Sequence, residues 1–358
     1  MPRCLPVVRA SLAVLILALL IGTGPSVSAQ TPEANEPDLA AVKAYLVDQV
    51  GQMKAATTQV RAITQRYYDL AQNAQFDYEG LWQTNKVELA PLLMVDKQTW
   101  LEASNRYESS EGIVAGVPSL SYFDTWIDAG PSGTEDPANA LDWTLTLPDG
   151  RKLEKPGNLM THLTEPAFYG TIDEFVGLRL DMDGDGKQEL GEVLPEANIL
   201  QGSVVALDDA TSQLQQAVDA WQPTLEDAFT ALTTMIPTIN QYFEQWKLST
   251  FVTGAQSTET AFVAVSRLSD INGIFHGLDV TYDGIRPAVT AVDPALDAQI
   301  DAGFADLVGY VTDLYAQESG GTHFTPEQAD LFGAEAQSRA TNLAGLVSQA
   351  VALLGLQV

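Results

Sequence analysis

Residues 181–192 have the types and spacing of an EF-hand calcium loop. Acidic residues occupy loop positions 1, 3 and 5, a glycine occupies position 6 and a glutamate occupies position 12. A calcium ion takes about six to eight oxygen ligands, and a sharp turn at Gly186 would bring both ends of the loop onto one ion. The predicted ligands are Asp181, Asp183, Asp185, the carbonyl of Lys187, Glu189 directly or through water, and Glu192 with both oxygens. The alternative is an acidic, glycine-rich surface turn.

The residue at loop position 8 indicates what kind of calcium site this would be. Paired EF-hands carry an aliphatic residue there, whereas this chain has Gln188. We therefore expect a single structural calcium loop and not a paired sensor.

A second group of residues has the spacing of transition-metal ligands. His276 and Asp279 are three residues apart, and so are Glu108 and Glu111. On a helix, residues at this spacing share one face, so each pair can chelate one ion. If the two helices pack together, one imidazole and three carboxylates would suit iron, zinc or manganese better than copper(I). The alternative is a capped helix end with surface acids, because 47 acidic residues make such spacings common.

The two segments that carry these pairs resemble each other. Residues 106–116 and 267–277 share an arginine, two glycines and an isoleucine in register. This weak echo is compatible with a duplicated helical bundle in which the two segments occupy equivalent positions.

The elements that must position these residues are mostly helices. Apolar residues recur at steps of three, four and seven over most of the chain, which is the helical period. The expected helices span about 37–70, 78–94, 97–115, 195–221, 224–246, 258–280, 295–318 and 326–354. Pro237 is expected to kink or split its helix, and Asp293 and Thr325 precede prolines as N-caps.

Residues 117–192 differ from the helical stretches on either side. They are rich in proline and glycine, and residues 143–147 alternate between apolar and polar side chains. With residues 151–154 they predict a short β-hairpin across the turn Pro148-Asp149-Gly150. We interpret 117–192 as a loop-rich insert that the calcium ion helps to hold in one conformation.

The N-terminus has the pattern of a cleavable signal peptide over residues 1–29. Arg3 and Arg9 precede an apolar run that is too short to span a membrane, and a small-residue cleavage site follows. The only cysteine, Cys4, precedes the apolar run, so a lipid anchor is not expected. Residues 30–36 read as a linker. The mature protein is therefore expected to be secreted or periplasmic, without disulfides, cysteine-bound metal or a transmembrane helix.

The charge of the chain restricts its partners. The formal net charge is −29, and removal of the two signal arginines makes it more negative. Nucleic acids and anionic membranes attract clusters of lysine and arginine, so neither is an expected partner. A strongly negative surface instead favours cations.

Three segments of the sequence resemble the imelysin family: residues 111–120, 270–287 and 292–301. The resemblance implies an all-α fold of tandem, pseudo-repeated four-helix bundles over residues 37–358. The first half would be 37–116, the insert 117–192 and the second half 193–358. It also implies export and a metal site around a Gly-x-His-x-x-Glu motif. His276 stands at the histidine of that motif, but Asp279 replaces the glutamate and Gly273 is displaced by one position.

The family includes an extracytoplasmic iron-uptake component, EfeO, and alginate-binding relatives. The resemblance thus implies an exported metal-binding protein that passes iron, or zinc, to a membrane permease or another envelope protein. One alternative is a polysaccharide-binding or adhesion module, for which Trp126 and Trp143 would line a groove.

The other alternative is a metallopeptidase, so enzymatic activity is left open. The sequence lacks the His-Glu-x-x-His pattern of zinc peptidases. His323 follows two glycines and reads as a loop residue, and the role of His162 stays undecided.

Overall fold

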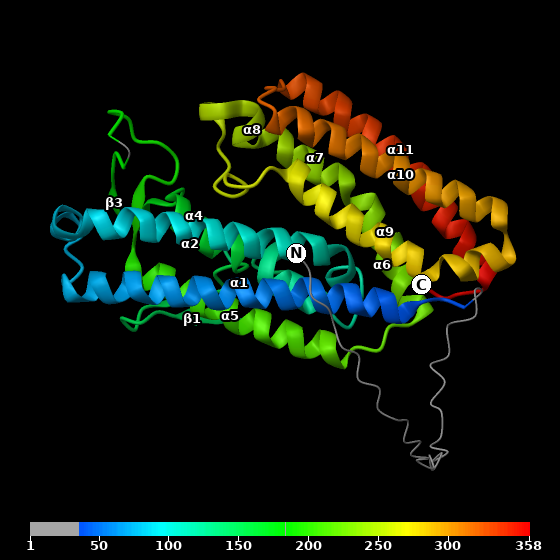
Figure 1. The fold of residues 1–358 in the computed structure, drawn as a ribbon, viewed down its shortest axis with the longest axis horizontal. Coiled ribbons are helices and arrows are strands. Elements are labelled where there is room, and N and C mark those ends of the chain that lie inside the picture. Colours follow the sequence, from blue (N-terminus) through cyan, green and yellow to red (C-terminus); the bar gives the residue numbers. More distant parts are fainter. Residues whose placement is uncertain (1–35, 183) are drawn as a thin grey trace, which may run out of the picture. The chain divides into compact units, whose positions relative to one another are not determined.

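Long α-helices make up most of the chain in the computed structural model, which describes residues 36–182 and 184–358. The predicted signal peptide, residues 30–35 of the predicted linker, and Asp183 lie outside the described residues. The long helices are α1 (Leu39–Asn73), α2 (Tyr78–Val114), α5 (Ala197–Ala220), α6 (Leu225–Met235), α7 (Ile239–Leu248), α9 (Arg267–Val292), α10 (Pro294–Ser319) and α11 (Pro326–Leu354). The predicted all-α fold with a small insert is confirmed (Figure 1). None of the helices in the described part of the chain is both long and apolar enough to cross a membrane.

The helix ends follow from local sequence signals. The carboxylate of Asp293 accepts hydrogen bonds from the backbone N–H groups of Ala295 and Leu296, both at 3.0 Å. Thr325 and Gln328 form a reciprocal capping box at the start of α11. Both predicted caps are confirmed, and Pro237 splits its helix into α6 and α7 as expected.

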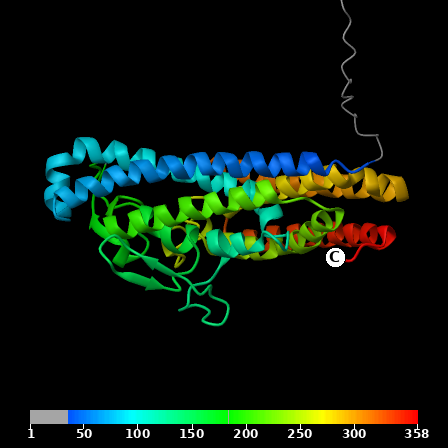
Figure 2. The same cartoon turned by 90° about the horizontal axis from the view of Figure 1, so that it is seen from below.

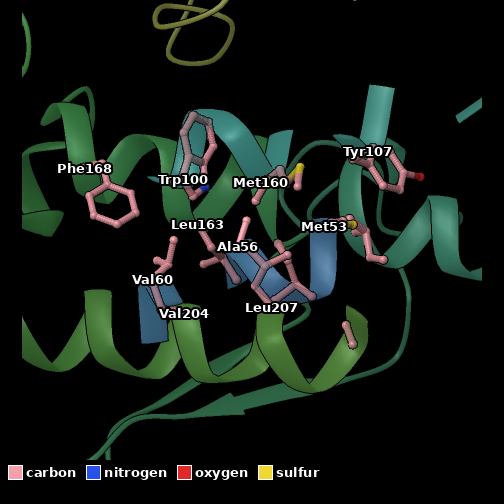
Figure 3. Packing of buried hydrophobic residues seen from close by; sticks show 14 of the residues in the cluster. Met53, Ala56, Val60, Trp100, Tyr107, Met160, Leu163, Phe168, Val204 and Leu207 are labelled. Atoms are coloured by element: carbon pink, nitrogen blue, oxygen red, sulfur yellow. The ribbon is translucent and has the colours of Figure 1, made fainter. Parts of the chain in front are cut away.

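The first hydrophobic core lies between α1, α2 and α5. The apolar stripe of α1 packs against the other two helices through residues such as Met53 and Val60. Part of the insert completes this core: a π-helical turn, η2 (Met160–Thr164), and the short helix α4 (Glu165–Tyr169) contribute Leu163 and Phe168 (Figure 3). The indole N–H of the buried Trp100 donates to Thr164 Oγ1 at 2.8 Å, which attaches α2 to that segment.

The second core is a bundle built from the split helix α6–α7 together with α9, α10 and α11. Its largest buried side chains are aromatic. Trp246 packs edge-to-face on Phe243 and Phe324, and the rings of Tyr282 and Phe304 stack with centroids 5.5 Å apart. Full burial of each such side chain contributes about 1.5–3 kcal/mol. Helices α9 and α10 run obliquely to α1 in Figure 1, and Figure 2 shows α10 and α11 (orange to red) at the same end of the molecule as the start of α1 (dark blue).

Helix α2 of the first core packs against α9 of the second, and glycines allow their backbones to approach closely. A Cβ atom at Gly277 would lie 2.8 Å from the carbonyl oxygen of Ser109, and one at Gly112 would lie 3.0 Å from that of Ile274. Gly273 faces the backbone of Glu108 at 3.2 Å in the same way. Gly112, Gly273 and Gly277 are among the residues that the two echoing segments share. The residues that the two similar segments share therefore lie where α2 crosses α9.

The insert contains two small antiparallel sheets. The predicted hairpin is confirmed: β1 (Thr144–Thr146) pairs with β2 (Lys152–Glu154), with Leu145 opposite Leu153. A second pair, β3 (Val176–Arg179) and β4 (Val193–Pro195), was not predicted. The calcium-type loop connects these two strands, so it lies in a β-hairpin and not between two helices. The other short elements are α3 (Ser121–Asp124), a π-helical turn η1 (Thr125–Ala129), α8 (Thr250–Thr253), and the 3-10 turns η3 (Asp173–Phe175), η4 (Ile236–Thr238) and η5 (Gly254–Gln256).

Three helix predictions were wrong in detail. The predicted helices 78–94 and 97–115 form the single helix α2, because Pro91 faces solvent and the buried stripe continues past it through Leu93. Pro195 ends strand β4, and the following helix starts at Ala197. Residues 258–266 are not helical, because the carboxylate of Glu165 accepts the backbone N–H groups of residues 262–264. Phe262 has a φ of 54°, which a helix does not allow.

The glycine contact between α9 and α2 yields a prediction with an internal control. Gly277→Ala should destabilise the protein by about 1–3 kcal/mol, since its Cβ would push α9 away from the backbone of α2. Gly345→Ala, on the exposed face of α11 with no atom within 4 Å, should stabilise it by about 0.5–1 kcal/mol through helix propensity. Urea unfolding of both variants checks the signs. Equal effects at the two positions would contradict the close-contact interpretation.

Candidate metal centre

Three carboxylates meet at the side of α2 that faces the insert. Glu108 and Glu111 come from successive turns of α2, and Asp128 comes from the π-helical turn η1. One oxygen from each lies within 4.8 Å of the others, and the residues are only 3–5% exposed. Among the described residues, no other group of three or more His, Cys, Asp or Glu side chains meets this condition. Irregular π-helical turns such as η1 often occur at functional sites, where they redirect a side chain.

Two of these carboxylates have oxygens with no hydrogen-bond partner in the described structure. Glu108 Oε2 and Glu111 Oε2 are both buried and unpaired. The other oxygen of Glu111 accepts a hydrogen bond of 2.6 Å from the hydroxyl of Tyr242 on α7. Buried acceptors without donors are rare in folded proteins and are costly when charged, so these oxygens are available to a cation.

Burial and the neighbouring negative charges raise the pKa values of two members of this cluster, Glu108 and Asp128. Burial, followed by the charges of Asp270, Glu111 and Asp128, raises the pKa of Glu108 well above its usual range. Burial and the charge of Glu111 raise the pKa of Asp128 in the same way. A cation would reverse this effect, because its charge favours the deprotonated carboxylates.

Arg267, the first residue of α9, is a positive charge that acts on both Glu108 and Asp128 and lowers their pKa values. Its Nη1 donates to Asp270 Oδ2 at 2.8 Å, and its Nε donates to Gln245 Oε1 at 2.9 Å. The guanidinium lies against the ring of Phe262 at 3.7 Å and that of Tyr242 at 4.6 Å. Burial alone would lower the pKa of Arg267, but the charges of Asp270, Glu108 and Asp128 outweigh burial and raise it.

Residues 257–266, which we call the strap, pass beside the centre and connect the region of α8 to α9. The buried carboxylate of Glu165 accepts three backbone N–H groups of the strap at 2.8–3.0 Å. Thr171 Oγ1 donates to the carbonyl of Thr260 at 2.7 Å. The strap is thus attached to the insert at two points, and it holds Phe262 against Arg267.

A cavity of about 650 Å³ opens beside the cluster. Its lining includes Glu111, Asp128, Arg267 and strap residues 259–262. His162 also lines it, and its Nε2 lies 2.6 Å from Glu135 Oε2 while Asn158 contacts its Nδ1 at 2.9 Å. His162, which the sequence left undecided, therefore belongs to the lining of this cavity.

The structure does not bring the other predicted metal ligands, both on α9, into the carboxylate group. His276 is exposed and Asp279 half-buried, and neither belongs to the carboxylate group. His276 and Glu108 both line a separate depression of about 420 Å³. Of the four predicted transition-metal ligands, Glu108 and Glu111 thus belong to the carboxylate group, and their partner there is Asp128. Ligation by His276 and Asp279 stays a prediction.

The predicted calcium loop closes on itself through backbone contacts. Asp181 accepts the N–H groups of Gly184 and Gly186 at 2.7 and 2.9 Å, and Gly186 has the positive φ expected of it, 88°. Glu192 accepts the N–H groups of Met182 and Glu189 at 2.7 and 2.9 Å. Asp185 accepts the N–H of Lys187 at 2.8 Å. Asp183 lies outside the described residues, and calcium binding here stays a prediction.

The groove expected of a polysaccharide module is present beside the β1–β2 hairpin. It has a volume of about 450 Å³, and both Trp126 and Trp143 line it. Their rings lie 6.0 Å apart at 76° to each other, so they do not form one flat surface.

Several residues of the centre were not predicted from the sequence. Asp128 follows no recognisable spacing, and Tyr242 and Glu165 come from distant segments. The sequence offers one weak indication for Asp270: it lies one helical turn after Arg267, in the segment 267–277 that resembles 106–116. The charge of Asp270 contributes to the raised pKa of Glu108.

The sequence matches the family model described as imelysin over residues 39–353. This range runs from the first residue of α1 to within one residue of the end of α11, so it includes both cores and the insert. No curated protein matches the sequence.

The buried carboxyls predict how stability depends on pH in the metal-free protein. Burial raises the pKa of Asp96, Asp124 and Glu165 to about 7, and that of Asp270 to about 6. Unfolded, these groups titrate near pH 4. Between these values the folded state binds more protons, so the free energy of unfolding should fall as the pH rises from about 5 to about 8.

Each carboxyl contributes up to about 1.4 kcal/mol per pH unit to this fall. Urea unfolding in the presence of a chelator at several pH values measures it. A free energy of unfolding that stays constant or increases over this range would contradict the assignment.

Proposed function

Since this chain belongs to the imelysin family, we propose that it is an exported protein that captures a transition-metal cation, iron in particular, at Glu108, Glu111 and Asp128. The observation that carries the proposal is the set of three buried carboxylates, two of which, Glu108 and Glu111, have an oxygen without a hydrogen-bond partner. Such a set is unfavourable without a cation and binds one strongly once the carboxyls are deprotonated.

The donor atoms support a hard cation. The cluster offers only oxygen ligands, which suit ferric iron or manganese better than soft copper(I). If His276 joins the site after a side-chain movement, its imidazole extends the range to ferrous iron and zinc. The net charge of −29 concentrates cations near the protein and speeds their capture.

Export and transfer complete the proposal. The predicted signal peptide places the protein outside the cytoplasm, in the periplasm or secreted. There it passes its metal to a membrane permease or another envelope protein. The raised carboxyl pKa values support a route for release, because protonation of Glu108 and Asp128 competes with the metal.

We also propose a structural calcium ion in the loop 181–192. The loop joins β3 to β4, and Lys97 of α2 donates a hydrogen bond to the carbonyl of Gly191 at its end. A bound ion would hold the acidic side chains of this loop in one arrangement and so fix the hairpin against α2.

Polysaccharide binding is the second candidate, and the groove beside Trp126 and Trp143 favours it. The perpendicular rings are a weaker sugar platform than two parallel exposed rings would be. A metallopeptidase would need a general base beside an open metal position. His162, which pairs with Glu135 in the cavity, is the candidate base.

Substitution of the metal ligands tests the proposed capture site. Glu111→Gln and Asp128→Asn keep the side-chain shape but remove a charged ligand. Each should weaken binding of Mn²⁺ or Fe²⁺ by at least about 10- to 100-fold, the range seen even for outer-shell changes. Calorimetry and mass-spectrometric metal analysis measure the loss. Glu226→Gln, an exposed acid on α6, is the matched control and should bind like the wild type.

The same assay tests the histidine. Loss of metal from His276→Ala would support ligation by its imidazole, and full retention would restrict the site to the carboxylates. If Glu111→Gln and Asp128→Asn both keep the wild-type metal content, the proposed function is wrong.

Thermal unfolding with and without calcium tests the structural calcium ion. Calcium should raise the melting temperature of the wild type, because an ion that binds only the folded state stabilises it by about 2.7 kcal/mol at 100 times its Kd. Asp181→Ala should abolish this increase, whereas Asp313→Ala, an exposed acid on α10, should keep it. The structural role is excluded if Asp181→Ala and the wild type melt alike with and without calcium.

A further inference from the structure

We propose that the centre binds its cation together with a small bidentate oxyanion of the carbonate or carboxylate class, and that Arg267 holds this anion. The inference rests on the proposed metal capture and adds a second ligand to it. Arg267 would then be a binding residue and not only a counter-charge.

The first argument is the space beside the carboxylates. Three carboxylates that each give one oxygen leave about half of a six-coordinate shell open. The cavity of about 650 Å³ reaches Glu111 and Asp128, and it is much larger than the volume that a few metal-bound waters would need, at about 30 Å³ each. A chelating anion would fill open metal positions and part of this space.

The second argument is the unused part of the Arg267 side chain. A guanidinium has five N–H groups, and buried ones normally find acceptors. Arg267 is 3% exposed, yet its Nη2 donates no hydrogen bond within the described part of the chain. Arg267 also lines the cavity, so this group is available to a ligand there. The planar fork of a guanidinium matches the two oxygens of a carboxylate or carbonate.

The third argument is that the guanidinium is held rigidly. Phe262 of the strap lies 3.7 Å from Arg267 Cζ on one side, and Tyr242 of α7 lies 4.6 Å from it. Gln245 and Asp270 fix its Nε and Nη1. Little side-chain entropy therefore remains to be lost when an anion binds.

Charge sets the order of binding. Without metal, the acids around Arg267 repel an anion, since Asp270, Glu108 and Asp128 all lie close enough to raise the pKa of the arginine. A cation at the cluster offsets that repulsion. The metal and the anion should therefore strengthen each other's binding by the same factor, as thermodynamic linkage requires.

The experiment measures metal affinity in the mature protein with and without anions. Mn²⁺ is titrated by calorimetry in degassed buffer free of carbonate and carboxylates, then with bicarbonate, with oxalate, and with tetrahedral sulfate as control. We expect bicarbonate or oxalate to tighten Mn²⁺ binding at least tenfold, and sulfate to have no effect. Free anions also complex Mn²⁺ in solution, which weakens apparent binding, so only a gain in affinity supports the inference. The two arms distinguish carbonate from carboxylate.

Arg267→Lys keeps the charge but removes the fork, and it should bind Mn²⁺ without the anion effect. If this buried substitution prevents folding, Phe262→Ala replaces it, because it loosens the guanidinium and should reduce the anion effect. If the wild type binds Mn²⁺ with equal affinity in every buffer, the proposed anion binding is wrong, while the proposed metal capture still stands. An anion effect that survives in Arg267→Lys would overturn the role of Arg267. Absence of Mn²⁺ binding in all buffers would reject metal capture itself.

Discussion

The close contact between α2 and α9 is the constraint on which the rest of the structure depends. Glycines at the crossing let the two backbones touch, with Gly277 facing the carbonyl of Ser109. This contact places Glu108 and Glu111, from one core, beside Arg267 and Asp270, from the other. Larger residues at the crossing would separate these helices and with them the charges of the centre.

The centre is unfavourable by itself, and the two cores offset its cost. Glu108, Glu111 and Asp128 are nearly fully buried, with one fixed positive charge nearby, and two of their oxygens lack partners. A protein tolerates such a group when the surrounding packing holds it in place and when function requires it. Here α2 is anchored through Trp100 and its long apolar stripe, and α9 through the aromatic packing of the second core.

The insert contributes to the centre as well as to the first core. Its turn η1 supplies Asp128, its turn η2 supplies His162, and Glu165 of α4 fixes the strap that carries Phe262. The cavity beside the carboxylates is therefore formed between the insert, the strap, the two helices that cross and the split helix α6–α7. The loop-rich insert thus forms one wall of the site.

The sequence alone determined the features that depend on local interactions. Helical periodicity and the caps at Asp293 and Thr325 located most helices, the Pro148-Asp149-Gly150 turn located the hairpin, and the three-residue spacing placed Glu108 and Glu111 on one face. The tertiary structure alone decided which distant groups join them. Asp128 reaches the cluster through an irregular turn that has no periodic signal, and Arg267 faces it only because α9 crosses α2. The strap is not helical as predicted, because the carboxylate of Glu165, almost a hundred residues earlier in the chain, accepts its backbone N–H groups. Such long-range contacts form only when both partners are buried together, and a local sequence pattern does not indicate which distant residue will be the partner.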